Sequence, residues 1–296
     1  MEVYRYDPVD MPLPPHRDFV AMVNAASTED NVNMRGFLDD HVFFVKDVVR
    51  DGHHLADLPE HVKALVKEVW ARYMPTWGEG RSYPTRILGE VNGGTGSVML
   101  EFTDTPELFG ADMRVLGAVD VVDGKITRWA DYWDSAAYDG KRFEKIKRTP
   151  VEPPLALRSK PAATSARIRD VASKFVEMLS GGDTEGAATL FSYDGVFEDR
   201  SLNMKIVGFP AINRYLARVN HKSPFGRGVK LGHVVGGDAG GGFEWASSSS
   251  SVKTGAAALS INAEGQITRA SIVYDSRDLS ATSRNELAAL TLEPLQ

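Results

Sequence analysis

One carboxylate stands between two indole side chains near the middle of the chain. Trp129, Asp131 and Trp133 alternate in a stretch rich in β-branched and aromatic residues, which predicts a strand after the turn at Asp123-Gly124. Side chains of a strand alternate between its two faces, so these three share one face. A carboxyl group among aromatic rings loses hydration, and its pKa rises. The pattern predicts that Asp131 is a general base; the other interpretation is a surface strand with an ion-paired aspartate.

The sequence around this strand recurs later in the chain. Ile126 and Ile267 lie in matching segments at an offset of 267 − 126 = 141, and Leu88 and Leu231 lie in another matching pair at an offset of 231 − 88 = 143. Solenoid repeats have periods of only about 20–50 residues. The spacing therefore predicts a tandem duplication of whole domains.

The second copy lacks the acid of the first. Ile272 stands where the first copy has Asp131, and one aromatic neighbour is lost with it. The second copy is therefore expected to be structural. Asp134 and Asp275 are present in both copies on the opposite strand face, which predicts that they form structural hydrogen bonds.

Composition excludes several classes of function. The length of 296 residues favours two domains. A net charge of −6 argues against a nucleic-acid partner. The absence of cysteine excludes disulfides, thiolate nucleophiles and cysteine-ligated zinc. No run approaches the roughly 20 apolar residues of a membrane span, and residues 1–15 have no apolar signal segment. A cytoplasmic protein that binds no membrane is expected.

The order of predicted elements is helices first and then an antiparallel meander, which is typical of the α+β class. The expected domains are residues 10–148 and 163–280, with a proline-rich linker at 149–162 and a tail at 281–296. Ser247–Ser251 is interpreted as a polar strand, with a disordered loop as the alternative. Helices are expected near 15–26, 32–38, 59–73, 165–179, from 209, and at 284–290; strands are expected at 42–46, 83–91, 97–103, 112–122, 126–135, 191–198, 228–235, 242–251, 255–262 and 266–275.

The segment from Trp129 to Asp134, Trp-Ala-Asp-Tyr-Trp-Asp, resembles the last strand of limonene epoxide hydrolase, which reads Trp-Arg-Asp-Tyr-Phe-Asp. With the order of elements, it makes the chain similar to the nuclear-transport-factor-2-like (NTF2-like) superfamily, which includes ketosteroid isomerase and SnoaL-type polyketide cyclases. The resemblance implies two ketosteroid-isomerase-like domains, each with helices packed on a curved antiparallel sheet that forms a cone-shaped barrel. It also implies a pair of domains within one chain, with a further homodimer left open.

The resemblance places the catalytic aspartate on Asp131. The epoxide hydrolase also uses an arginine and a second acid, but the arginine is absent here, and only Glu101 could replace that acid. Glu101 and Arg114 are expected to orient or protonate a substrate. The substrate-binding wall is expected to comprise Phe43, Met113, Val115, Trp129, Trp133 and Tyr138.

These residues predict general acid/base catalysis on a hydrophobic small molecule, without metal or cofactor, by isomerisation or cyclisation of a carbonyl compound. One alternative is an epoxide hydrolase or an epoxide-opening cyclase. Another is a non-catalytic binding or scaffold protein. A partner acid and an arginine beside Asp131 would favour epoxide opening, a lone acid would favour proton transfer, and an Asp131 that faces solvent would favour binding.

Histidines give two further signals. His53, His54 and His61 surround Asp57, which could form a metal site, although a solvated surface cluster is the simpler interpretation. His233 lies on a strand of the second copy, where it could act as an acid/base group or be a hydrogen-bonded sheet residue.

Overall fold

The computed structural model describes residues 82–137, with gaps at 93–94, 105, 107–109 and 123–124, and residues 163–292. The helices and strand expected before residue 82 lie outside this range, as do the four histidine and aspartate positions between 53 and 61. In the first part, the strands are β1 (Ser82–Asn92), β2 (Thr95–Asp104), β3 (Met113–Val122) and β4 (Lys125–Tyr132), followed by the 3-10 helix η5 (Ser135–Ala137). In the second part, the elements are α6 (Ala166–Gly181), α7 (Thr184–Thr189), β5 (Phe191–Asp199), β6 (Met204–Val207), α8 (Phe209–Val219), β7 (Val229–Gly237), β8 (Gly240–Ser247), β9 (Thr254–Ile261), β10 (Ile267–Tyr274), η7 (Ser276–Asp278) and α9 (Ala281–Thr291).

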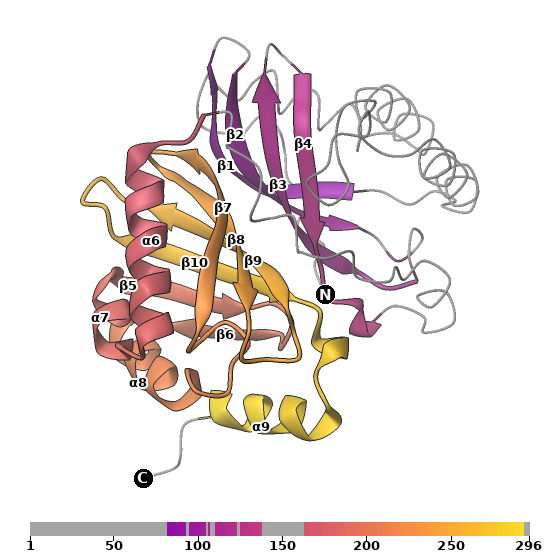
Figure 1. Cartoon of the computed structure of the whole chain (residues 1–296), viewed down its shortest axis with the longest axis vertical. Coiled ribbons are helices and arrows are strands. Elements are labelled where there is room, and N and C mark those ends of the chain that lie inside the picture. Colours follow the sequence, from indigo (N-terminus) through magenta and orange to yellow (C-terminus); the bar gives the residue numbers. More distant parts are fainter. Residues whose placement is uncertain are drawn as a thin grey trace.

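The strands form two sheets that pack face to face (Figure 1). The first has the order β1-β2-β3-β4, and the second has the order β6-β5-β10-β9-β8-β7. The meander β7–β10 therefore has the same strand order as β1–β4. This arrangement confirms the α+β class, while the two tandem domains stay a prediction. The expected closed barrel is wrong for the described residues, because the outer strands of each sheet pair with a neighbour on one side only.

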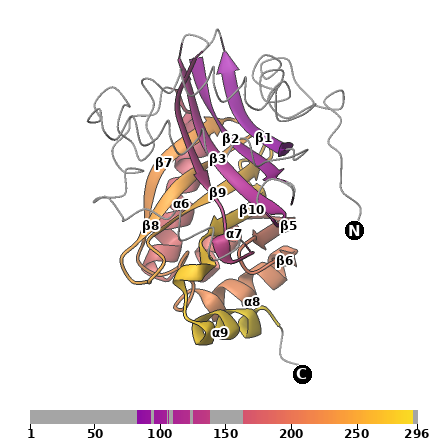
Figure 2. The ribbon, with the colours of Figure 1, turned by 90° about the vertical axis from the view of Figure 1, so that its right-hand side faces the viewer.

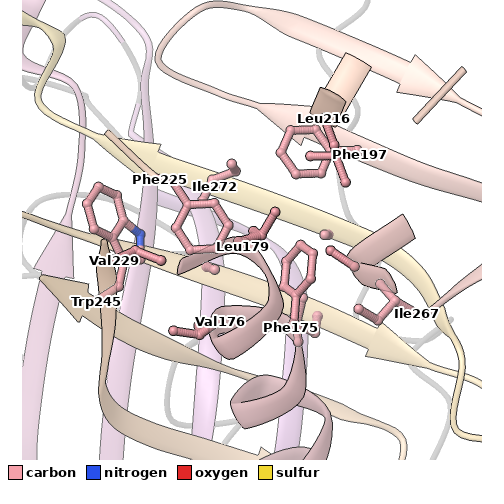
Figure 3. Close-up of a cluster of buried hydrophobic side chains, with 14 of the residues drawn as sticks. Phe175, Val176, Leu179, Phe197, Leu216, Phe225, Val229, Trp245, Ile267 and Ile272 are labelled. Carbon is pink, nitrogen blue, oxygen red and sulfur yellow. The ribbon is translucent and has the colours of Figure 1, made fainter. Parts of the chain in front are cut away.

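Helices cover the face of the second sheet that points away from the first (Figure 1). The side chain of Ser165 caps α6 by accepting a hydrogen bond from the amide of Arg167, and Gly182 ends the helix in the left-handed conformation. One apolar side of α6 lies against β7 and β8. Figure 3 shows part of the resulting core, with side chains of the helices against those of the strands. The aromatic members of this core are Phe175, Phe191, Phe197, Tyr215, Phe225, Phe243, Trp245 and Tyr274.

The first sheet crosses the second over a hairpin rich in glycine, as the perpendicular view shows (Figure 2). A Cβ atom at Gly237 would lie 2.7 Å from Cγ of Glu90, and one at Gly242 would lie 2.6 Å from Cε of Met99. Both contacts are shorter than real Cβ contacts. The glycines of β7 and β8 therefore leave room for the side chains of β1 and β2.

Two equivalent serine–aspartate hydrogen bonds cross the contact between the sheets. The hydroxyl of Ser276 donates to Oδ1 of Asp134 at 2.9 Å, and the hydroxyl of Ser135 donates to Oδ2 of Asp275 at 2.7 Å. Donors and acceptors are both related by the offset of 141 residues, so the contact is reciprocal, as in a two-fold interface. The structural role that the sequence predicts for both aspartates is confirmed.

The serine-rich segment differs from its interpretation as a strand. Strand β8 ends at Ser247, and residues 248–251 form bends. The hydroxyl of Ser249 donates to the carbonyl oxygen of Arg227 at 2.9 Å, and that of Ser250 accepts from the amide of Val252 at 3.2 Å. Serine side chains that bond to nearby backbone in this way compete with strand pairing.

Candidate functional site

Asp131 lies on β4 opposite Gly117 of β3, on the face of the first sheet that points away from the second sheet. Tyr132, its neighbour, packs into the apolar contact between the sheets. The predicted alternation is thus confirmed for Asp131 and Tyr132. However, Asp131 is exposed to solvent, so the expected shielding by aromatic rings is wrong. The strand ends at Tyr132, and Trp133 beyond it is only half-buried.

Glu101 lies on the opposite face from Asp131 and is not part of a site around it. Its carboxylate accepts hydrogen bonds at 3.0 Å from Nη2 of Arg200 and at 2.8 Å from Nη2 of Arg86. Burial opposes ionisation, but the charges of Arg200 and Arg86 outweigh it and hold the pKa of Glu101 below its usual range. A carboxylate that is ion-paired on both sides is a structural group between the sheets.

Arg114 is also engaged across the contact between the sheets. Its Nη2 atom donates to Oε1 of Glu198 on β5, and Arg269 donates to Oε2 of the same carboxylate at 2.6 Å. Burial opposes ionisation here too, but these hydrogen bonds lower the pKa of Glu198 to about 2. Neither Glu101 nor Arg114 therefore shares a face with Asp131, because alternate residues of β2, β3 and β4 point to opposite sides.

The remaining predicted pocket residues are only partly described. Met113 and Val115 are buried and lie on the same face of the first sheet as Asp131. The backbone of Trp129 pairs with Val119. The side chain of Trp129 and the whole of Phe43 and Tyr138 lie outside the described residues.

The apolar interior between the second sheet and its helices contains an acid that the sequence did not predict. Asp199, at the end of β5, is 1% exposed. Its Oδ2 accepts a 3.0 Å hydrogen bond from the hydroxyl of Tyr274, and its Oδ1 accepts 3.0 Å hydrogen bonds from the amides of Ser201 and Leu202. Phe197, two residues earlier and thus on the same strand face, belongs to the apolar core. Asp199 is therefore a carboxyl group at the wall of an aromatic interior.

The environment of Asp199 favours its neutral form. Burial raises the pKa of this carboxyl to about 7, although the hydrogen bonds from Leu202, Tyr274 and Ser201 favour the charged form. Burial likewise raises the pKa of Tyr215 on α8, and the charge of Asp199 adds to this rise. Near neutral pH, the site therefore holds a carboxyl group close to its midpoint and phenols that keep their protons.

Alternation along β5 was the signal that could have identified Asp199. The predicted strand ended at Glu198, and Phe197 is an aromatic residue of the type that faces a core. One further residue of strand places position 199 on the same face as Phe197. Ile272, which stands at the position that matches Asp131, is buried in this core, so the acid of this core lies on another strand.

His233 forms a separate buried pair. Its Nε2 lies 2.7 Å from Oδ2 of Asp120, which belongs to β3 of the first sheet. Both side chains are almost without solvent contact. The pair therefore connects the two sheets, which corresponds to the structural interpretation of His233.

In the part of the chain that the structure describes, no three histidine or acidic side chains gather in a way that could hold a metal ion. Within the same residues, no helix has the length and apolar character that crossing a bilayer requires.

No family model and no curated protein matches the sequence. Solved structures do match. The chain is similar to NTF2-like, SnoaL-like and steroid-isomerase structures. A steroid delta-isomerase from Pseudomonas aeruginosa matches with a TM-score of 0.33 and 12% identity over 43% of this chain and 90% of that chain. A SnoaL-like protein of unknown function from Burkholderia thailandensis matches with a TM-score of 0.33 and 8% identity over 38% and 98% of the two chains. An NTF-2-like protein of unknown function from Burkholderia xenovorans matches with a TM-score of 0.31 and 13% identity over 37% and 83%.

Proposed function

We propose that the protein is a general acid/base enzyme that moves a proton on a hydrophobic carbonyl compound, with Asp199 as the base. The observation that supports this proposal is the buried carboxyl of Asp199, whose pKa burial raises to about 7. A general base is most effective when its pKa lies near the working pH. Buried carboxyls with strongly shifted pKa values are also enriched at functional sites.

In this proposal, the Asp199 carboxylate removes a proton from the carbon next to a carbonyl group, and an enolate forms. Asp199, now protonated, returns the proton to a different carbon, so the net reaction is an isomerisation. The hydroxyl of Tyr215, which shares the apolar core, keeps its proton because burial raises its pKa, and it would donate to the enolate oxygen. Tyr274 holds the carboxyl group in place through its 3.0 Å hydrogen bond.

Asp199 is almost completely buried, so a substrate must displace part of the protein to reach it. Helix α9 has few buried side chains over this core. Of its 11 residues only Leu287 is buried. Its polar links to the rest of the chain include the Lys222–Glu286 ion pair, with both side chains about half exposed, the 3.3 Å hydrogen bond from Nε of Arg218 to the carbonyl of Leu290, and the 3.4 Å hydrogen bond from Nη1 of Arg284 to the carbonyl of Ser276. We propose that α9 moves when the substrate enters.

Isomerisation or cyclisation is favoured over epoxide opening by the surroundings of this acid. Glu198 and Arg200 flank Asp199 in sequence, but their side chains lie on the other face of β5 and bond to the first sheet. Asp199 accepts hydrogen bonds from one phenol and two backbone amides. An arginine and a second acid, which epoxide opening would use, are not among these contacts.

A direct test uses a β,γ-unsaturated cyclic ketone, whose rearrangement to the conjugated ketone changes its ultraviolet absorption. Exchange of the hydrogen next to the carbonyl for deuterium, followed by NMR in D2O, reports proton removal alone. Asp199→Asn keeps the shape of the side chain and should lower both rates by about 10²-fold or more.

Asp131→Asn is the matched comparison, because it makes the same change at the exposed acid. It should leave both rates within about twofold of the unchanged protein, in line with a surface position. The reverse result, loss in Asp131→Asn and full activity in Asp199→Asn, would return the catalytic centre to the first domain. Unchanged rates in both variants would favour a non-catalytic binding protein.

A further inference from the structure

The strand that carries Asp199 is held from its opposite face by the first sheet. Glu198 precedes Asp199 on β5, and Arg200 directly follows the end of the strand. Because neighbouring side chains alternate, both point away from the apolar interior. Both are buried, with 6% and 5% of their surfaces exposed. Both bond to residues of the first sheet. The acid therefore sits between two side chains that are fixed by a different part of the chain.

Arg200 is bound by β2 and β3. Its Nη2 donates to Oε1 of Glu101 at 3.0 Å, and its Nη1 donates to the carbonyl oxygen of Val115 at 3.3 Å. Glu101 is in turn bound by Arg86 at 2.8 Å. These bonds fix the buried guanidinium, because charge-assisted hydrogen bonds are strong where little solvent competes for the bonded atoms.

Glu198 is bound from both sheets. Arg114 of β3 donates to its Oε1 atom. Arg269 and the hydroxyl of Ser271, both on β10, donate to its Oε2 atom at 2.6 and 3.0 Å. The neighbour of Asp199 on this side therefore has one fixed rotamer, which is set jointly by the two sheets.

We propose that Glu101 and Arg114 of the first sheet are positioning residues for Asp199, which they hold in register by fixing the side chains of Arg200 and Glu198. The inference rests on the proposed role of Asp199 as the base. The first sheet would then support catalysis by Asp199, although neither Glu101 nor Arg114 reaches the apolar core in which Asp199 lies.

The physical reason lies in the turn that follows Asp199. Its Oδ1 atom accepts hydrogen bonds from the amides of Ser201 and Leu202, which lie directly after Arg200. If residues 198–200 shift, these amides and the carboxylate no longer align, and water gains access to the carboxyl group. A displacement on the order of 1 Å at a catalytic group is enough to cost a large part of its rate effect.

Titration of Asp199 in the full-length protein tests this inference without any substrate. NMR of the 13C-labelled aspartate carboxyl groups reports the pKa of Asp199, with Asp199→Asn used for assignment. Besides the two residues that are changed, the titratable groups that interact with Asp199 include Tyr274, Tyr215 and Asp134, and all three remain in each variant. The two test variants are Glu101→Gln and Arg114→Gln.

These two changes have opposite direct effects of charge. Glu101→Gln removes a negative charge and would lower the pKa of Asp199, whereas Arg114→Gln removes a positive charge and would raise it. Loss of position admits water in both variants, which lowers the pKa toward the 3.8 of an exposed aspartate. We expect a fall of about one unit or more in both, and a fall in kcat of roughly tenfold with little change in KM.

Ser97→Ala is the control for a general weakening of the contact between the sheets. Ser97 is buried, and its hydroxyl accepts from the amide of Gly236 on β7 at 3.0 Å. Strand β7 is at the far edge of the second sheet from β5 and β6. The pKa of Asp199 should stay near 7 in this variant.

Three results would overturn the inference: an unchanged pKa in both test variants, pKa shifts of opposite sign that follow charge alone, or an equal fall in Ser97→Ala. Arg114→Gln keeps the test usable if Glu101→Gln does not fold, because Arg114 is one-third exposed and Arg269 still pairs with Glu198. The proposed function fails by a separate result, which is full activity in Asp199→Asn.

Discussion

The hydroxyl of Tyr274 donates a hydrogen bond to Oδ2 of Asp199 at 3.0 Å, and each of the two residues is 1% exposed. The hydrogen bond favours the carboxylate, whereas burial favours the carboxylic acid. Burial is the larger of the two effects, and the pKa of Asp199 is raised to about 7. The following predictions depend on this balance.

Turnover should rise with pH through about 7, because only the ionised form of Asp199 accepts a proton. Tyr274→Phe removes a hydrogen bond that lowers the pKa, so the rise should move to higher pH. The pH dependence of kcat/KM for both proteins checks this. A rise that moves to lower pH in Tyr274→Phe would contradict the assigned direction of the hydrogen bond's effect.

The ionisation of Asp199 should lower the free energy of unfolding as pH rises, whereas turnover should increase. Its pKa is higher in the folded protein than the 3.8 of the unfolded chain. The folded state therefore binds the proton more tightly, and the contribution to stability is complete below pH 3.8 and is lost as pH rises through about 7. The loss is on the order of 4 kcal/mol at 1.36 kcal/mol per pKa unit.

Urea unfolding between pH 4 and 8 measures this dependence, and Asp199→Asn should flatten it. At pH 8 the variant should be the more stable protein, because it removes a buried charge. Parallel curves for the two proteins would mean that the carboxyl does not titrate in this range.

The protonation of Glu198 should lower the free energy of unfolding as pH falls in the acid range. Its pKa is lowered from 4.5 to about 2, so its contribution is present above pH 4.5 and is lost as pH falls through 2. A loss of roughly 2 kcal/mol is expected once screening at the one-third exposed Arg114 and Arg269 is allowed for. Unfolding between pH 2 and 5 measures it, and Arg114→Gln should make this dependence shallower.

The strands of both meanders could be predicted from the sequence. Alternation and turn residues place them within about two residues of the observed ends, except at the ends of β4 and β8. The presence of Asp134 and Asp275 in both copies predicted their structural role. An aspartate that is kept in the copy without the catalytic acid is expected to stabilise the fold. Strand β6 and helix α7 were not predicted, since each is short.

The site was harder to predict, because it depends on which face of each strand meets the other sheet. Glu101 was expected to be catalytic because the resemblance implies a second acid, and Arg114 was expected to orient or protonate the substrate. Their partners, Arg200 and Glu198, lie 99 and 84 residues away in sequence. A pattern along one strand contains no information about such partners. The burial of Asp199 likewise depends on the end of a strand, which is the least certain part of a sequence-based boundary.

The glycine-rich hairpin provides a test of the contact between the sheets. Gly242→Ala would place a methyl group 2.6 Å from Cε of Met99 and 2.4 Å from the carbonyl oxygen of Ala257, and it should cost about 1–3 kcal/mol. Gly181→Ala is the matched control, because a Cβ atom there has nothing within 4 Å. It should be neutral or stabilising. Equal losses in both variants, measured by urea unfolding, would count against tight packing at this hairpin.

Helix α9 should exchange its amide hydrogens faster than α6. It buries one side chain, whereas α6 buries six, and segments with few buried contacts open first. Hydrogen–deuterium exchange with mass spectrometry compares the two helices directly. Leu287→Ala should increase exchange in α9 and leave α6 unchanged. Protection of α9 equal to that of α6 would argue against its movement during substrate entry.

Both sheets belong to one chain, and this has a consequence for the buried charges between them. Association of separate molecules costs several kcal/mol of translational and rotational freedom, and desolvation of Glu101, Glu198 and Arg200 adds to that cost. A covalent connection replaces the bulk concentration with a local one on the order of millimolar. The pair of sheets is therefore insensitive to dilution, and the buried charges between them stay paired at any concentration of the protein.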